Sequence, residues 1–257
     1  MWNGFENVAK SFGIDVREFQ KTIISHKPKK GIPRGVTLPT SFNARSQWPT
    51  CIHSIRDQGG CGSCWAFSSA AILEDRFCIH SNGAINVRLS PQDMVNCDFS
   101  NGGCNGGYLT PSVSYLMAEG LVSEECLPYT EESGICTYQC ADSSIEYRKY
   151  ACKAGSTAIP TSADDIKYEL MTNGPMMVGF TIYSDFMVYA NGIYEHITGG
   201  SEGGHAVKLI GWEYNGGRLV WICQNQWGDS WGELGDFRIY AGEAGIDSAA
   251  FACMPDI

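Results

Sequence analysis

The sequence predicts an α+β protein in which a helical lobe is followed by a strand-rich lobe. The first observation is a helical pattern that begins at Cys64 and continues to about Gly120. Within it Ser90 is a typical N-cap, since Pro91 follows in the first turn and Asp93 stands three residues after the cap. We therefore expect the chain between about residues 50 and 145 to fold mainly as helices.

Two more helices are predicted from their ends. Thr110-Pro111 opens a helix that ends at Gly120. Ser162 begins another, which the run Asn173-Gly174-Pro175 stops. The latter helix marks the change from helical to extended patterns.

The second observation is that the chain after this helix reads as strands. Asn215-Gly216 is a strong hairpin-turn signal between two of them. The predicted strands are Met176–Tyr183, Ala206–Tyr214, Leu219–Gln224 and Phe237–Ala241. Residues of about 146–257 should thus form a β lobe, with a binding cleft between the two lobes.

Composition narrows the functional classes. The 257 residues carry a net charge of −10, which argues against nucleic acid or an anionic membrane as a partner. The sequence contains no apolar run of 18 residues, so it predicts no membrane-spanning helix. Twelve cysteines indicate an oxidising compartment. The residues after Met1 nevertheless do not have the pattern of a signal peptide. We expect a secreted protein, or one of a lysosome- or vacuole-like acidic compartment, whose signal has been removed.

The most informative motif is the run from Gln58 to Trp65, Gln-Gly-Gly-Cys-Gly-Ser-Cys-Trp. It places Cys64 after a glycine-rich turn and at the start of an apolar helical segment. The helix dipole there should favour thiolate over thiol, and the thiolate is the nucleophile. Taken alone, Cys61-x-x-Cys64 could also be a redox pair or half a zinc site. A redox pair would need a βαβ context and a zinc site would need a second pair of ligands, and the sequence shows neither.

Further motifs identify a resemblance. His205 lies in Gly-Gly-His-Ala-Val, and Asn225 lies in Gln-Asn-Gln-Trp-Gly. With Cys61-Gly-Ser-Cys-Trp65 in the same order, residues 38–257 resemble the papain family of cysteine proteases, and within it the cathepsin B branch. The blocks beginning at Leu38 and at Asn173 carry the narrower likeness.

The resemblance implies roles for four residues. Cys64 would be the nucleophile, and His205 would take its proton and later protonate the leaving amine. Asn225 would hold the ring of His205 in one orientation. Gln58 would form the oxyanion hole with the backbone N–H of Cys64. By itself, His205 would more often be a satisfied core histidine.

The family fold is a helical lobe beside an antiparallel, barrel-like β lobe, with chain ends that cross between them. The substrate-binding residues it implies are Gly106, Gly107, Tyr108, Leu109, Gly179, Gly204, Ala206, Trp227 and Ala249. The disulfides it implies are Cys51–Cys78, Cys61–Cys104, Cys97–Cys136 and Cys126–Cys140. No metal and no cofactor is implied.

Several positions depart from the family pattern. Gln226 stands where a serine is common, and the stretch from Cys126 to Cys136 is too short for an occluding loop. Internal cleavage of proteins is therefore expected, with little removal of C-terminal dipeptides. Ala249 replaces an acid, which predicts a hydrophobic preference two residues before the scissile bond. Three further cysteines lie outside the implied pairs. We expect Cys223 to be a buried thiol and Cys152 to pair with Cys253.

Residues 1–37 are interpreted as a short propeptide, with a helix from Asp15 to Ile24 and a linker around Pro33. An ordinary N-terminal extension is the alternative. Residues 38–257 would be the catalytic domain of a monomeric, latent endopeptidase. Its partners would be protein and peptide substrates, its own propeptide and protein inhibitors of cysteine proteases. A silent relative that only binds a partner, and a transglutaminase-like acyltransferase, remain the alternatives.

Overall fold

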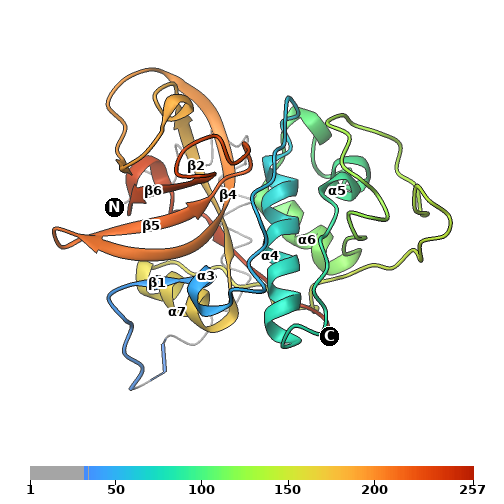
Figure 1. The fold of residues 1–257 in the computed structure, drawn as a ribbon, viewed down its shortest axis with the longest axis horizontal. Helices are drawn as coiled ribbons and strands as arrows, with labels where there is room; N and C mark the ends of the chain where they lie inside the picture. The colour runs from blue at the N-terminus through green and yellow to red at the C-terminus, as the bar shows by residue number, and fades with distance from the viewer. Residues whose placement is uncertain (1–31, 34) are drawn as a thin grey trace.

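The computed structural model describes residues 32–33 and 35–257, and it shows two lobes side by side (Figure 1). The predicted helix at 15–24 lies outside the described residues. The α-helices are α3 Ala44–Gln47, α4 Cys64–His80, α5 Pro91–Cys97, α6 Leu109–Ala118 and α7 Ala163–Asn173, with short 3-10 helices η1 Gly103–Asn105, η2 Phe186–Val188 and η3 Glu243–Gly245. The strands are β1 Phe42–Asn43, β2 Met176–Tyr183, β3 Ile193–Tyr194, β4 Ser201–Asn215, β5 Arg218–Gln224, β6 Asp236–Tyr240 and β7 Ala250–Phe251.

The helix ends follow local capping chemistry. The Ser90 side chain accepts a hydrogen bond from the Asp93 N–H, and that of Ser162 accepts one from the Asp165 N–H, as predicted. The predicted start of α6 is wrong by one residue. This helix begins at Leu109, and the hydroxyl of Thr110 is buried without a partner instead of capping it.

The strands form one sheet with the order β3-β6-β5-β4-β2-β7, and β1 pairs with β4. Within the described residues the end strands β3 and β7 do not pair, so the sheet is open. The family likeness predicted a barrel-like sheet instead. β4 begins at Ser201, five residues before the predicted start. Gly203 and Gly204, which the prediction left outside the strand, pair with Ile182 and Thr181 of β2.

The β4–β5 turn is shifted by one residue from the prediction. Asn215 pairs with Arg218, so the two-residue turn is Gly216-Gly217 and not Asn215-Gly216. Both glycines have positive φ, 57° and 82°. A turn of this kind needs positive φ at both central residues, which glycine adopts without strain.

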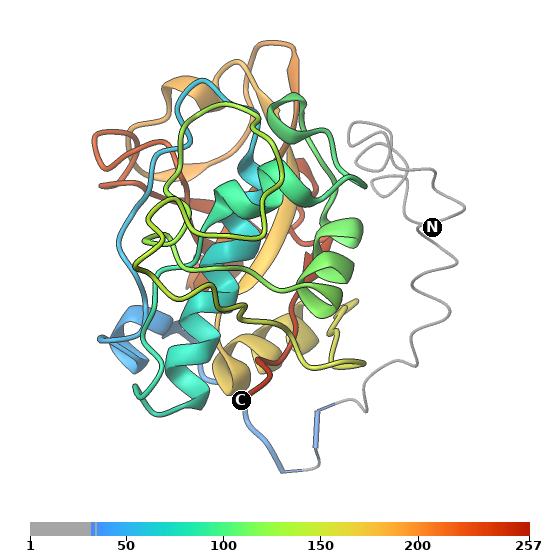
Figure 2. The same cartoon turned by 90° about the vertical axis from the view of Figure 1, so that its right-hand side faces the viewer.

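The chain ends cross between the lobes. β1, the first strand of the chain, joins the sheet of the strand lobe, whereas the last residues return to the foot of α4 (Figure 1). There Lys153 N–H donates to the Met254 carbonyl, and Asp256 N–H donates to the Ala151 carbonyl. Viewed from the helical side, the segment between α6 and α7 runs in long loops over the outer face of this lobe (Figure 2).

Disulfides hold these loops and ends. The structure contains the four pairs that the resemblance implies, Cys51–Cys78, Cys61–Cys104, Cys97–Cys136 and Cys126–Cys140, and a fifth, Cys152–Cys253. Cys64 and Cys223 remain as thiols, and Cys223 is buried as expected.

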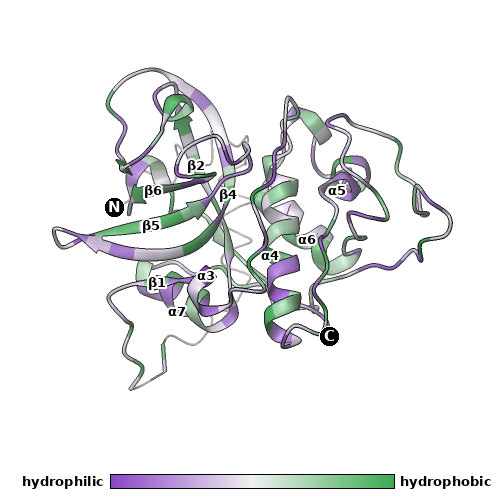
Figure 3. Cartoon of the chain, in the orientation of Figure 1, coloured by the Kyte–Doolittle hydropathy of each residue, from purple (hydrophilic) through white to green (hydrophobic). Residues whose placement is uncertain are grey.

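Helix α4 is buried almost all round because both lobes pack on it, and a polar band interrupts its apolar surface (Figure 3). The band contains Asp75, which is fully buried, and its Oδ2 lies 2.7 Å from Nζ of Lys208 on β4. The neighbouring Arg76 pairs with Glu169 of α7 at 3.1 Å and donates to the carbonyls of Gly174 and Pro175. Buried charges need such partners.

Replacing Asp75 by Asn should destabilise the protein by about 3 to 5 kcal/mol, because the Lys208 ammonium would stay buried without its counter-charge. Urea unfolding with disulfides intact measures this free energy. Glu195→Gln is the control, since the Glu195–Arg218 pair is exposed and its loss should change little. Equal effects of the two substitutions would contradict a stabilising role for the buried pair.

Candidate active site

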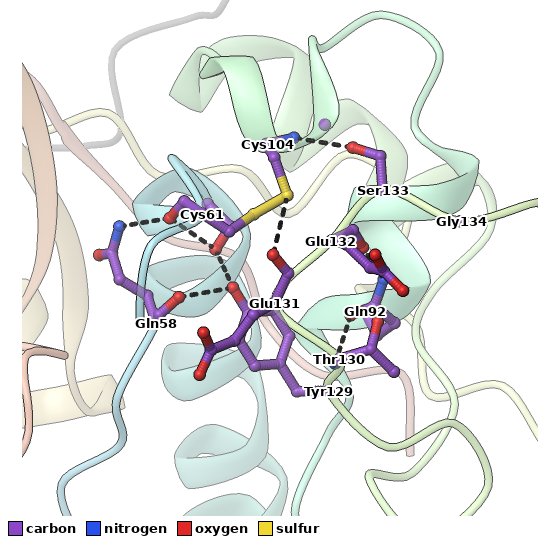
Figure 4. The surroundings of a disulfide bond; sticks show 12 residues. Gln58, Cys61, Gln92, Cys104, Tyr129, Thr130, Glu131, Glu132, Ser133 and Gly134 are labelled. Carbon is purple, nitrogen blue, oxygen red and sulfur yellow. Dashed lines mark hydrogen bonds between the residues drawn. A yellow bond between two sulfur atoms is a disulfide. The ribbon is translucent and has the colours of Figure 1, made fainter.

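Cys64 is the first residue of α4, and the loop before it is fixed on two sides. Gln58 N–H donates to the Gln226 carbonyl at 2.9 Å, which ties the loop to the strand lobe. Gly62 N–H donates to the Cys104 carbonyl at 2.9 Å, and the Cys61–Cys104 disulfide fixes the same contact covalently (Figure 4). The start of α4 is thus held at the junction of the lobes.

His205 lies within β4, opposite Phe180 of β2, and is almost fully buried. Its Nε2 lies 2.8 Å from Oδ1 of Asn225, which follows the end of β5. The ring of Trp227 packs on the imidazole with 4.7 Å between ring centroids. The hydrogen bond between His205 and Asn225 is therefore shielded from water on that side.

The orientation of the Asn225 amide fixes the tautomer of His205. The backbone N–H of Gln226 donates to the same Oδ1 at 3.0 Å. Because a backbone N–H only donates, this atom is the amide oxygen, and His205 must donate to it from Nε2. In the neutral ring Nδ1 is then the unprotonated nitrogen, free to accept a proton.

The sulfur of Cys64 lies against β4 at the residue after His205. Burial raises the pKa of the Cys64 thiol, although hydrogen bonds from the backbone N–H groups of Ala206, Trp65 and Cys64 itself lower it in part. Burial also lowers the pKa of His205 to about 4, while its hydrogen bond with Asn225 raises it. Each group on its own is thus more stable in its neutral form.

These shifts contradict the lowered thiol pKa that the helix start predicted for Cys64. Desolvation of the sulfur exceeds the stabilisation that the first-turn N–H groups provide. A thiolate and an imidazolium formed together attract each other, and this attraction is stronger where water is excluded. Neither the thiolate of Cys64 nor the imidazolium of His205 is therefore favoured in the absence of the other.

Gln58 is held by a contact that the sequence did not predict. Its Nε2 donates to the Cys61 carbonyl at 2.8 Å, and its Oε1 accepts from Nε2 of Gln226 at 3.1 Å. Gln226 also donates to the Ala206 carbonyl at 2.8 Å. Because the Cys61 carbonyl can only accept and Gln226 Nε2 can only donate, these two bonds together fix which end of the Gln58 amide is the donor. The departure at Gln226 was the signal in the sequence.

The predicted substrate-binding residues come from both lobes. On the strand side Gly179 is paired with Ala206 across β2 and β4, and its N–H donates to the Ala249 carbonyl at 3.1 Å. Tyr108 and Leu109 begin α6 on the helical side, and Leu109 belongs to the same apolar cluster as Ala206 and Ala249. Gly204 and Trp227 flank His205 and Asn225 in sequence. Of the glycine pair, Gly106 has a φ of 109°, and a Cβ on Gly107 would lie 2.6 Å from the Trp65 ring.

One group of residues has the spacing of a metal site within the described part of the chain, formed by His53, Glu74 and Asp75. Its ligand atoms are already used. His53 bonds Asp75 and Asn86, and Glu74 accepts from Arg56 and from the backbone N–H of Leu89. These polar groups are satisfied by protein partners, and the cluster needs no cation for neutrality.

Comparison with known proteins agrees with this geometry. A model of the papain family of cysteine proteases matches residues 38–254. The chain belongs to this family. It is 39% identical over 278 residues to cathepsin B-like cysteine proteinase 5 of Caenorhabditis elegans, covering 92% of this chain and 81% of that protein. It is 41% identical over 240 residues to cathepsin B of Dictyostelium discoideum, covering 87% and 76%.

A solved structure of procathepsin B S9 from Trypanosoma congolense superimposes on this cathepsin B-like protease with a TM-score of 0.83 and 32% identity, covering 91% of this chain and 85% of that one. Among the described residues, no helix has the length and apolar character needed to span a bilayer.

Replacing Gln226 by Met should lower kcat of this protease roughly 10- to 100-fold with a smaller change in KM, because a freed Gln58 amide can turn its oxygen toward the reacting carbonyl. Hydrolysis of a fluorogenic peptide at saturation measures this. Gln224→Met is a matched control, since that buried amide bonds the His53 carbonyl and not Gln58. An effect equal to that of the control would count against a positioning role.

Proposed function

We propose that this protease is an endopeptidase that cleaves peptide bonds through a thiolate–imidazolium pair of Cys64 and His205 and an acyl-enzyme. The observation that carries the proposal is the hydrogen bond from His205 Nε2 to Asn225 Oδ1, whose acceptor atom is identified by the Gln226 N–H. It leaves Nδ1 as the acceptor for a proton while the sulfur lies beside the same strand.

Each group has one role in the proposed reaction. Cys64 gives its proton to His205, and the sulfur attacks the carbonyl carbon of the scissile bond. The resulting oxyanion accepts hydrogen bonds from the Cys64 backbone N–H and from Gln58 Nε2. His205 then protonates the leaving amine, and water, deprotonated by the same ring, hydrolyses the thioester.

Alkylation by an epoxysuccinyl-type inhibitor should label Cys64 and leave Cys223 unmodified, because Cys223 is fully buried and burial raises its pKa well above the ordinary value. Peptide mapping by mass spectrometry identifies the labelled thiol. Cys64→Ala should abolish peptide hydrolysis and retain the native circular dichroism spectrum. Undiminished turnover by that variant would refute the proposed chemistry.

The residue two positions before the scissile bond would enter the apolar contact between the lobes. In the proposed pocket the lining would come from Ala249, Ala206 and Leu109, which belong to one apolar cluster and carry no charge. The nearby carboxylate of Asp247 is directed elsewhere, since it accepts from Nε1 of Trp221 at 3.1 Å and from the Gly242 N–H. A guanidinium there would be desolvated without a partner, which favours Leu, Val or Phe.

Two fluorogenic peptides that differ only at this position, Leu against Arg, should show the preference. We expect the Leu peptide to have the higher kcat/KM, by roughly 10-fold or more, because an unpaired charge in an apolar site is costly. Ala249→Glu should raise activity on the Arg peptide, whereas Ala244→Glu, in the half-buried 3-10 helix η3, should not. Equal turnover of both peptides by the unaltered chain would show that the pocket is misassigned.

We propose further that residues 1–37 are an inhibitory propeptide. Support comes from the family match, which begins at residue 38, and from the likeness to a solved procathepsin B. Protein inhibitors of cysteine proteases are proposed as partners of the open cleft. The five disulfides favour an oxidising compartment, secretory or lysosome-like.

Cutting the chain between Arg34 and Leu38 should increase the rate of peptide hydrolysis, because a segment lying across the cleft excludes substrate. The rate is measured with one fluorogenic peptide before and after the cut, and Cys64→Ala cut in the same way is the blank. Equal rates for the intact and the cut chain would rule out an inhibitory segment.

A further inference from the structure

A short segment beside the cleft, Tyr129 to Gly134, is held at several points (Figure 4). The hydroxyl of Tyr129 donates to the Gln58 carbonyl at 2.8 Å and lies 2.8 Å from Oγ of Ser63. The backbone N–H of Cys104 donates to Oγ of Ser133 at 3.0 Å. Gln92 accepts from the Thr130 N–H and donates to the Glu132 carbonyl. These bonds fix the segment against the loop that precedes Cys64.

Glu131 has a backbone conformation that side chains seldom adopt, with a φ of 61°. Its carbonyl is directed toward Sγ of Cys104, at 3.7 Å. Its carboxylate lies on the side of Gln58, while that of Glu132 points the other way (Figure 4). The bonds on either side of Glu131 hold this strained conformation, and strain of this kind is found where a side chain must be aimed.

The carboxylate of Glu131 lies directly over Gly59. A Cβ built on Gly59 would come within 2.3 Å of Cδ of Glu131, so only glycine leaves room for the carboxylate. Gly59 also has a positive φ, 57°, and its N–H donates to Oδ1 of Asp57. No hydrogen bond or ion pair to a cation is made by the Glu131 carboxylate among the described residues, and the side chain is exposed.

The neighbours of Gly59 place this carboxylate on the leaving-group side of the cleft. Asp57 pairs with Trp227, the residue that packs on His205. A Cβ on Gly62 would instead meet the Cys104 carbonyl and the backbone of Gly106, one of the residues implied to bind substrate. In the proposed reaction, a peptide chain that passes His205 and Gln58 after the scissile bond would then reach Gly59 and Glu131.

We propose that Glu131 is a specificity-determining residue that selects Lys or Arg as the second residue after the scissile bond. The proposal rests on the endopeptidase function above and names a preference of that same cleft. Asp57, whose Oδ1 accepts from the Gly59 N–H, has the same charge, so both carboxylates favour a cation. A substrate whose C-terminal carboxylate reaches this place is repelled, which opposes the release of C-terminal dipeptides.

The test uses amidated, internally quenched peptides that differ only in this residue, Lys against Glu, with enzyme expressed as the full chain and then cut before Leu38. We expect kcat/KM to be roughly 1.4- to 5-fold higher for the Lys peptide, the range for exposed charge pairs. The ratio is measured at about 0.01 M and about 1 M salt. At the higher concentration the Debye length falls to roughly 3 Å, so exposed charges that are farther apart are largely screened from one another.

Four variants assign the preference to one carboxylate. Glu131→Gln should bring the Lys/Glu ratio close to that of the screened wild type, and Glu131→Lys should invert it. Glu132→Gln is the matched control, one residue away with its side chain on the other face, and it should keep the wild-type ratio. Gly59→Ala should also lower the ratio, since its Cβ displaces the Glu131 carboxylate.

Turnover of both peptides with the same ratio in wild type and Glu131→Gln would overturn this assignment and leave the proposed function standing. An equal loss of the preference in Glu132→Gln would also overturn it, because the effect would then be one of net charge. Absence of turnover for every peptide, with Cys64 present and the chain cut, would instead overturn the endopeptidase function and this proposal with it.

Discussion

The buried charged turn of α4 is the constraint on which the rest of the structure depends. An isolated carboxylate or guanidinium inside a protein is strongly unfavourable, so Asp75 and Arg76 determine what must pack around them. Asp75 requires Lys208 of β4, and Arg76 requires Glu169 together with the carbonyls before β2. The helix of one lobe is thereby matched to the sheet of the other in a single register.

This match also sets the geometry of the cleft. Cys64 begins α4, and His205 precedes Lys208 by three residues on β4, so the contact that neutralises charge in the interior also joins the two elements that carry the thiol and the imidazole. Buried Gln226 makes a second link, because its side chain bonds both Gln58, in the loop before α4, and the Ala206 carbonyl of β4. The ion pair and this amide bridge thus join β4 to α4 and to the loop that precedes it.

Local chemistry was readable from the sequence where one residue decides the outcome. Ser90 and Ser162 cap their helices because a hydroxyl beside free N–H groups acts within one turn. The start of β4 was predicted too late, since the extended conformation of Gly203 and Gly204 depends on their pairing with β2. The thiol pKa of Cys64 was also misjudged, because desolvation comes from the tertiary fold and the sequence shows only the helix start. The role of Gln226 required its distant partners to be seen.

The disulfide Cys152–Cys253 joins residues 101 positions apart, so the chain segment that carries β2 to β7 is a covalently closed loop. In the chain-entropy account, closing a loop of this size restricts the unfolded state by about 4 to 5 kcal/mol. It also changes the result of damage. A self-inflicted cut in the exposed loop at Ile197, between β3 and β4, would divide the polypeptide but not the molecule. The piece carrying His205 and Asn225 would remain attached to the piece carrying Cys64, and a nicked protease would retain its complete set of cleft residues.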